Sequence, residues 1–108
     1  MDRTERIAAL NDQLRRDHRY GKVVITRGIQ ALGHQAIQEV LAAVAAFAEF
    51  TPENDPYAEH DCALMTVGGH RVIWKVDCYD TDLNFASDDP ADPAVTIRVL
   101  TIMLSDEW

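Results

Sequence analysis

The amino-acid sequence predicts a small α+β protein with a single domain, in which an antiparallel hairpin packs against helices. Its 108 residues suit one domain with one core. Apolar residues recur every three or four positions over residues 34–50, which is typical of an amphipathic helix. Two segments rich in β-branched and aromatic residues, 62–67 and 70–79, flank a Gly-Gly pair that suits a tight turn.

Residues 2–16 predict the first helix. Asp2 can cap its first turn, and Glu5 stands three positions later, as in a capping box. The apolar side chains at helical spacing are Ile7, Leu10 and Leu14.

A short strand and a second helix follow. Residues 22–26, KVVIT, predict a buried strand that Gly28 ends. The second helix should run from His34, on the surface, to Phe50, because Thr51-Pro52 stops it. Its apolar face carries Ile37, Val40, Leu41, Val44 and Phe47.

The hairpin turns at Gly68-Gly69, because a type I′ turn needs a positive φ at both central residues. A two-residue turn sets the register of both faces. The core face then carries Ala63, Met65, Val67, His70, Val72, Trp74 and Val76. On the other face the expected pairs are Thr66–Arg71, Leu64–Ile73, Cys62–Lys75 and His60–Asp77, with Tyr79 beyond them.

Residues 93–104 predict a closing helix. Asp92-Pro93 resembles a helix start, and Val95, Val99, Ile102 and Met103 share one helical face. The segment is also rich in β-branched residues, so a strand is the alternative. With the helix, the order of elements is α-β-α-β-β-α.

Charge is distributed unevenly along the chain, whose formal net charge is −8. The first 27 residues hold seven basic and four acidic residues, a net charge of +3. The other 81 hold three basic and fourteen acidic residues, a net charge of −11. Most of the surface should therefore repel nucleic acid, and direct binding to nucleic acid is not expected.

A basic cluster surrounds Tyr20 near the end of the first helix. We interpret it as a solvated helix end, where basic side chains interact favourably with the negative end of the helix dipole. The alternative is contact with phosphate or with an acidic partner. Its members are Arg15, Arg16, His18, Arg19, Lys22 and Arg27.

The sequence contains no apolar run that could span a membrane and no signal-peptide pattern, so we expect a cytoplasmic protein without membrane contact. In the predicted register Cys62 and Cys78 point to opposite faces and cannot form a disulfide. Two free thiols suit a reducing compartment. No motif for a cofactor is present, and we expect none.

The loop after the hairpin is acidic. Asp80, Asp82 and Asn84 have the spacing that opens an EF-hand, but Phe85 and Ala91 replace residues that calcium binding needs. We interpret the loop as solvated and as a surface for a protein partner. Its candidate partner-binding residues are Asp80, Asp82, Asp88, Asp89 and Asp92.

The open end of the predicted hairpin gathers the candidate catalytic residues His60, Asp77, Lys75 and Tyr79. A histidine with carboxylates could hold a divalent metal, and a lysine could stabilise a phosphate in the transition state. The structural alternative is a set of cross-strand ion pairs and caps, which we favour because no dense metal-ligand motif is present. Cys62 opposite Lys75 is either an activated thiolate or a small apolar filler.

Four segments resemble a family of small bacterial proteins of unknown function: TRGIQALG, FTPENDPYAEHD, IWKVDCYD and DPADPAVTIRVLTIMLSDEW. The resemblance extends from about Arg6 to Trp108, although Cys62 stands where the family pattern has an aromatic residue. Genes of this family are common on plasmids and other mobile elements of proteobacteria. The resemblance therefore implies a regulatory or counter-defence protein and no particular reaction.

Two functions remain open at this point. The first is a small acidic binding protein that docks on a protein partner, such as a nucleic-acid-binding host protein, by charge mimicry. The second is a small metal-dependent phosphodiester hydrolase that uses the cluster around His60.

Overall fold

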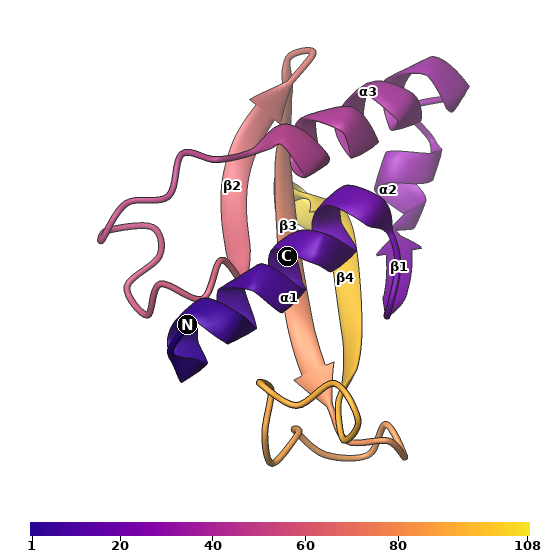
Figure 1. The fold of residues 1–108 in the computed structure, drawn as a ribbon. Coiled ribbons are helices and arrows are strands. Elements are labelled where there is room, and N and C mark those ends of the chain that lie inside the picture. Colours follow the sequence, from indigo (N-terminus) through magenta and orange to yellow (C-terminus); the bar gives the residue numbers. More distant parts are fainter.

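The structure of the protein, a computed structural model, describes all 108 residues (Figure 1). It is a single α+β domain with a four-stranded mixed sheet, which confirms the predicted fold class. The elements in order are α1 (Arg3–Asp17), β1 (Lys22–Ile25), α2 (Arg27–Gln30), α3 (His34–Ala46), β2 (Cys62–Val67), β3 (His70–Tyr79), β4 (Ile97–Leu104) and the 3-10 helix η1 (Ser105–Glu107). None of its helices combines the length and the apolar character that crossing a membrane requires.

The sheet has the strand order β1-β4-β3-β2. The β2–β3 hairpin turns at Gly68-Gly69, both with positive φ, and its register is the predicted one from Cys62–Lys75 to Val67–His70. β4 pairs antiparallel with β3 and parallel with β1. β1 and β2 are therefore the two edges of the sheet.

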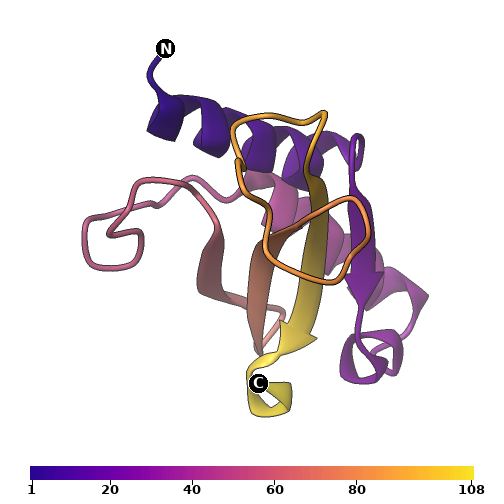
Figure 2. The same ribbon diagram turned by 90° about the horizontal axis from the view of Figure 1, so that it is seen from below.

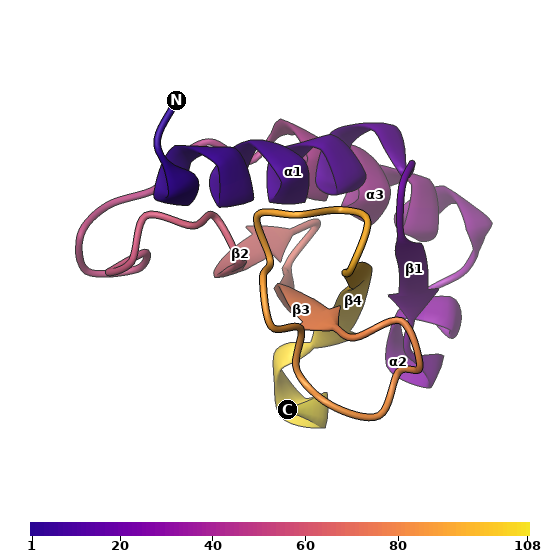
Figure 3. The ribbon, with the colours of Figure 1, turned by 60° about the horizontal axis from the view of Figure 1, so that its bottom comes forward.

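Helices cover one face of the sheet only (Figures 2 and 3). α1 and α3 lie side by side over this face, while η1 and the C-terminus lie on the opposite side. The covered face carries the core, with Trp74 fully buried at its centre. The core residues are Leu14, Ile29, Val40, Val44, Ala63, Val72, Trp74, Val76, Leu100 and Ile102.

The segment after the acidic loop is a strand, so the predicted helix over residues 93–104 is wrong. The Asp92 carboxylate accepts the N–H of Ala94 and makes a local turn instead of capping a helix. Residues 97–104 then alternate between the two faces of the sheet, with Arg98, Leu100 and Ile102 buried. β4 pairs on both sides, and this central position suits its β-branched residues.

Two other boundaries differ from the expectation. α3 ends at Ala46 rather than at Phe50, because Phe47 leaves the helix with ψ 130°. Phe47 and Phe50 then pack edge-on against Trp74, at centroid distances of 6.0 and 6.1 Å. The expected burial of β1 is also only partial, because β1 is an edge strand whose residues alternate between exposed and half-buried.

The short helix α2 was not predicted, and Gly28 lies within it. The carboxylate of Glu107 accepts the hydroxyl of Thr26 at 2.6 Å and the N–H groups of Gly28 and Leu104 at 3.0 and 2.8 Å. A Cβ atom at Gly28 would collide with the carboxylate of Glu107, so glycine allows this close approach. Glu107 thereby joins η1 to the start of α2.

Candidate functional site

The predicted cluster of His60, Asp77, Lys75 and Tyr79 does not form. β2 begins at Cys62, and His60 lies before it with a left-handed φ of 54°. No hydrogen bond or ion pair joins His60 to any of the other three residues. The ladder continues only as far as the carbonyl of Asp61, which accepts the N–H of Val76 at 2.7 Å.

His60 instead lies between two carboxylates on the helix side of the molecule. Its Nδ1 is 3.0 and 3.1 Å from the carboxylate oxygens of Asp12, and its Nε2 is 3.8 Å from Asp55 Oδ2. The ring stacks on Phe50, with the planes 2° apart and the centroids separated by 3.9 Å. The backbone N–H of His60 also donates to the carboxylate of Asp55. These contacts fasten the loop over residues 47–61 to α1.

Arg15 is the buried centre of this network. Its guanidinium donates to the carbonyls of Val44 and Phe47, both at 2.7 Å, and to Asp12 at 2.8 Å. It also lies 5.0 Å from the ring of Trp74, within the range of a cation–π interaction. Arg15 therefore satisfies carbonyls that the C-terminus of α3 leaves free.

Arg15 was expected in a solvated basic cluster, and no role was predicted for Asp12. A signal for the role of Arg15 is present in the sequence. Ile7, Asn11, Leu14 and Arg15 fall at the spacing of one helical face, and all four are buried. A polar residue on an apolar helical stripe indicates a buried hydrogen-bonding role.

The contacts of His60 join parts of the fold. Its Nδ1 is within hydrogen-bond distance of Asp12, and its Nε2 faces Asp55 at the longer distance of 3.8 Å. No group of three or more His, Cys, Asp or Glu side chains is arranged to hold a metal ion.

Lys75, Asp77 and Tyr79 lie on the opposite face of the sheet, which the large helices leave uncovered. Lys75 Nζ is 3.0 Å from Asp77 Oδ2 and 5.9 Å from the centroid of the Trp108 ring. Both residues lie on β3, two positions apart, so this pair is not one of the cross-strand ion pairs expected as the structural alternative. The pair is half exposed, so it contributes little to stability.

The two cysteines are free and lie on opposite faces of the sheet, as the register predicts. Burial raises the pKa of the Cys62 thiol, and Asp61, Asp55 and Asp77 raise it further. Burial also raises the pKa of Cys78. Neither thiol is therefore activated as a nucleophile, and Lys75 is paired with Asp77 instead of with Cys62.

The acidic loop over residues 80–96 divides its carboxylates between two roles. Asp80 accepts the N–H groups of Asp82 and Asn84, and Asp89 accepts that of Ala91 and pairs with Arg3. The Asp92 carboxylate likewise accepts the N–H of Ala94, so these side chains stabilise the conformation of the loop. The carboxylates of Asp82 and Asp88 make no hydrogen bond or ion pair within the chain, and both residues are exposed.

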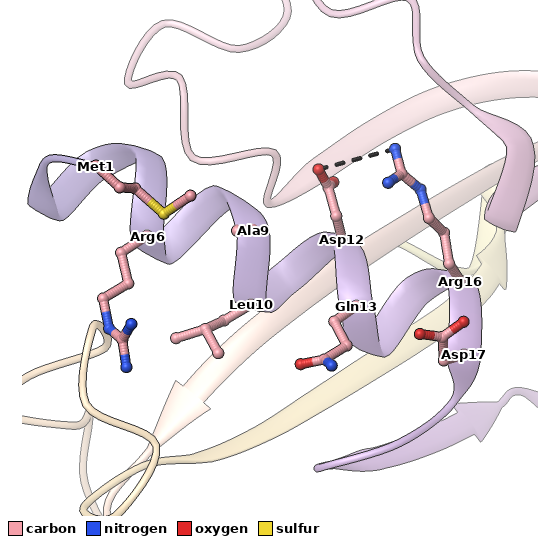
Figure 4. A pocket seen from close by; sticks show the side chains of 8 residues that line it. All are labelled: Met1, Arg6, Ala9, Leu10, Asp12, Gln13, Arg16 and Asp17. Atoms are coloured by element: carbon pink, nitrogen blue, oxygen red, sulfur yellow. Dashed lines mark ion pairs between the residues drawn. The ribbon is translucent and has the colours of Figure 1, made fainter.

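The largest hollow of the surface, about 510 Å³, lies along α1 (Figure 4). Every residue that lines it belongs to α1 or is Met1, so no second element directs groups into it. Arg16 and Asp12 form a long ion pair of 3.9 Å across it. Mixed charges on a single helix do not define a ligand.

The comparisons with known proteins support the resemblance in its coarser form, as membership of a family of unknown function. No match was found among curated proteins or among solved structures. Residues 25–107 match the family described as Protein of unknown function (DUF3768), and the match includes the whole sheet apart from most of β1. α1, which carries Asp12 and Arg15, lies outside the matched residues. Because the match covers more than half of the chain, this protein belongs to the DUF3768 family.

Proposed function

We propose that this protein is a small acidic binding protein that docks on a protein partner through the loop over residues 80–96. The observation that carries the proposal is an aromatic side chain, Phe85, that is 76% exposed on a tightly hydrogen-bonded loop. Leu83 beside it is 44% exposed. Exposed aromatic residues are frequent centres of binding energy in protein interfaces.

Hydrogen bonds hold this part of the loop in one conformation. The N–H of Asp80 donates to the carbonyl of Phe85 at 2.8 Å, and the N–H of Ser87 donates to the carbonyl of Cys78 at 2.9 Å. A further bridge joins Tyr79 to Ala86. A loop that is already ordered loses less conformational entropy when a partner binds, which favours affinity.

Asp82 and Asp88 add negative charge beside the apolar residues, and neither carboxylate is used within the chain. The partner should therefore present basic residues around an apolar hollow. The net charge of −11 after residue 27 would speed its approach. A host protein that binds nucleic acid has such a surface, and a role in counter-defence for a mobile element fits this partner class.

Affinity capture from host lysate, followed by measured binding of the captured protein, tests the proposal. Phe85→Ala should weaken binding at least about tenfold, the equivalent of about 1.4 kcal/mol. Tyr57→Ala is the matched control, because Tyr57 is 77% exposed on a different loop. Equal effects of the two substitutions would contradict the assignment of the loop.

Charge reversal distinguishes the electrostatic contribution to association from the contribution of apolar contacts by Phe85. The double variant Asp82→Lys with Asp88→Lys should slow association and reduce its salt dependence, with little change in stability. Glu53→Lys, an exposed change elsewhere, should leave association nearly unchanged. The hydrolase hypothesis makes a different prediction: calorimetry would detect micromolar binding of Mg²⁺, Mn²⁺ or Zn²⁺ that is lost in His60→Ala.

A further inference from the structure

The edge strand β2 pairs with β3 on one side only. It has no charged residue, no proline and no bulge in its sequence CALMTV, so it lacks the usual devices that block an edge. Leu64, at its middle, is 49% exposed.

The register shows which backbone groups are free. The two-residue turn makes Val67–His70 a hydrogen-bonded pair, so Met65 and Ala63 also bond to β3. The carbonyl of Asp61 accepts the N–H of Val76, so the same alternation of bonded and non-bonded residues continues to the start of β2. The N–H and C=O groups of Cys62, Leu64 and Thr66 therefore point away from the sheet.

A hollow flanks this edge on each face of the sheet, and the one on the uncovered face is mainly apolar. On the uncovered face, a hollow of about 420 Å³ is lined by Cys62, Leu64, Ile73 and Trp108, among others. On the helix face, a hollow of about 400 Å³ lies between β2 and the end of α3, where Ala46, Phe47 and Met65 line it. A strand added to β2 would direct alternate side chains into these two hollows.

We propose that the free edge of β2 binds an extended segment of another protein, apolar at its centre and basic at its flanks, as an additional strand. Backbone hydrogen bonds to Leu64 and Thr66 supply affinity, and the hollow on the uncovered face selects apolar side chains. This site is separate from the acidic loop, so it is a second binding surface of the protein.

Charge around the edge selects a basic segment. Glu39 lies beside the turn at Gly68, Glu49 lines the hollow on the helix face, and Asp61 precedes β2. None of these three carboxylates has an ion-pair partner within the chain. Burial, followed by repulsion from Asp55 and Asp77, raises the pKa of Asp61, so a cation there would relieve an unfavourable charge.

A second copy of the chain is a poorer occupant than a basic segment. Pairing β2 with β2 of another copy would bring the same acidic residues together, on proteins that each carry a net charge of −8. Two basic side chains lie near the edge: Arg71, opposite Thr66, is exposed and has no ion-pair partner, whereas Lys75 is already paired with Asp77.

The probe for this site is the capped peptide Lys-Lys-Thr-Val-Leu-Val-Thr-Lys-Lys, titrated into the isotopically labelled full-length protein. Binding should protect the amides of Leu64 and Thr66 from hydrogen exchange, while Met65, already bonded to β3, should change little. Replacing the central leucine of the peptide by proline should abolish binding, because proline removes a backbone donor. A peptide with glutamates in place of the lysines should bind at least about tenfold more weakly.

Protein variants test the edge itself. Thr66→Pro removes an outward N–H without breaking the β2–β3 ladder and should weaken peptide binding at least about tenfold, whereas Thr66→Val should not. Leu64→Gln should also weaken binding, and Leu83→Gln, at a site of similar exposure in the acidic loop, should not. Phe85→Ala should leave peptide binding intact, which separates this site from the acidic loop.

Three results would overturn the proposal. They are equal binding of the lysine and glutamate peptides, protection that appears elsewhere than at β2, and a dimer formed through β2 that excludes the peptide.

Discussion

Replacing Arg15 by alanine should strongly destabilise the protein. The Arg15 side chain is fully buried and donates to the carbonyls of Val44 and Phe47 and to the carboxylate of Asp12. Alanine would leave these acceptors without their donor in a region closed to water. Removing one partner of a buried charged pair costs about 3–5 kcal/mol, and we expect a loss of this size.

The loss can be measured by urea unfolding at pH 7, followed by the fluorescence of Trp74, over which the Arg15 guanidinium lies. The melting temperature should fall by at least about 12 °C, since each kcal/mol corresponds to about 4–8 °C for a domain near this size. The stability of Arg15→Lys should lie between those of Arg15→Ala and the native protein, because lysine keeps the charge but lacks the planar set of donors of a guanidinium.

Arg16→Ala is the matched control. Arg16 is the next residue of α1, but its side chain is 55% exposed and its ion pair with Asp12 is 3.9 Å long. Its removal should change stability by no more than about 0.5 kcal/mol. If the two alanine variants unfold at the same urea concentration, the buried network does not hold α3 to α1 as described.

Other predictions concern the core, the C-terminus and the thiols. Trp74→Ala should lower the free energy of unfolding in urea by about 3–5 kcal/mol. Trp74→Phe should lower it clearly less, since phenylalanine keeps a ring and removes a buried N–H that has no acceptor. An unchanged melting temperature for the alanine variant would refute the core assignment. Glu107→Gln should destabilise the protein more at pH 7 than at pH 3. Hydrogen bonds from Thr26, and then from Leu104, hold the pKa of Glu107 below its ordinary value of 4.5. The stability it contributes is therefore complete above that value and is lost as the pH falls through the folded-state pKa; an equal effect at both pH values would exclude this role. Cys62 and Cys78 should titrate as two thiols after unfolding without reductant, and a lower count would contradict their placement on opposite faces.

Elements with strong local signals were predictable from the sequence. Asp2 accepts the N–H of Glu5 at 2.8 Å, as its position before the first helix predicts. The Gly68-Gly69 turn determined the whole register of the hairpin. Both glycines adopt a positive φ and form a two-residue turn, so Val67 pairs with His70. Every later pair follows from this one, because successive side chains of a strand point to alternate faces. These features depend on neighbours within a few residues.

Residues 97–104 show where local signals were insufficient. Their apolar residues fit both a helical face and an alternating strand, and Asp92-Pro93 favoured the helix. The strand forms because β3 and β1 offer hydrogen-bonding partners on both sides, and neither pairing can be seen in the segment itself.

The surroundings of His60 were decided by tertiary structure alone. The sequence placed this residue opposite Asp77, on the continuation of β2. Its ring instead lies on Phe50 and between Asp12 and Asp55, of which Asp12 is 48 residues away in the chain. Spacing along one strand determines which residues can share a face. The packing of α1 against the loop after α3 determines which residues contact His60. Stacking on Phe50 and the charged hydrogen bond to Asp12 stabilise this position more than pairing with Asp77 at the end of the hairpin would.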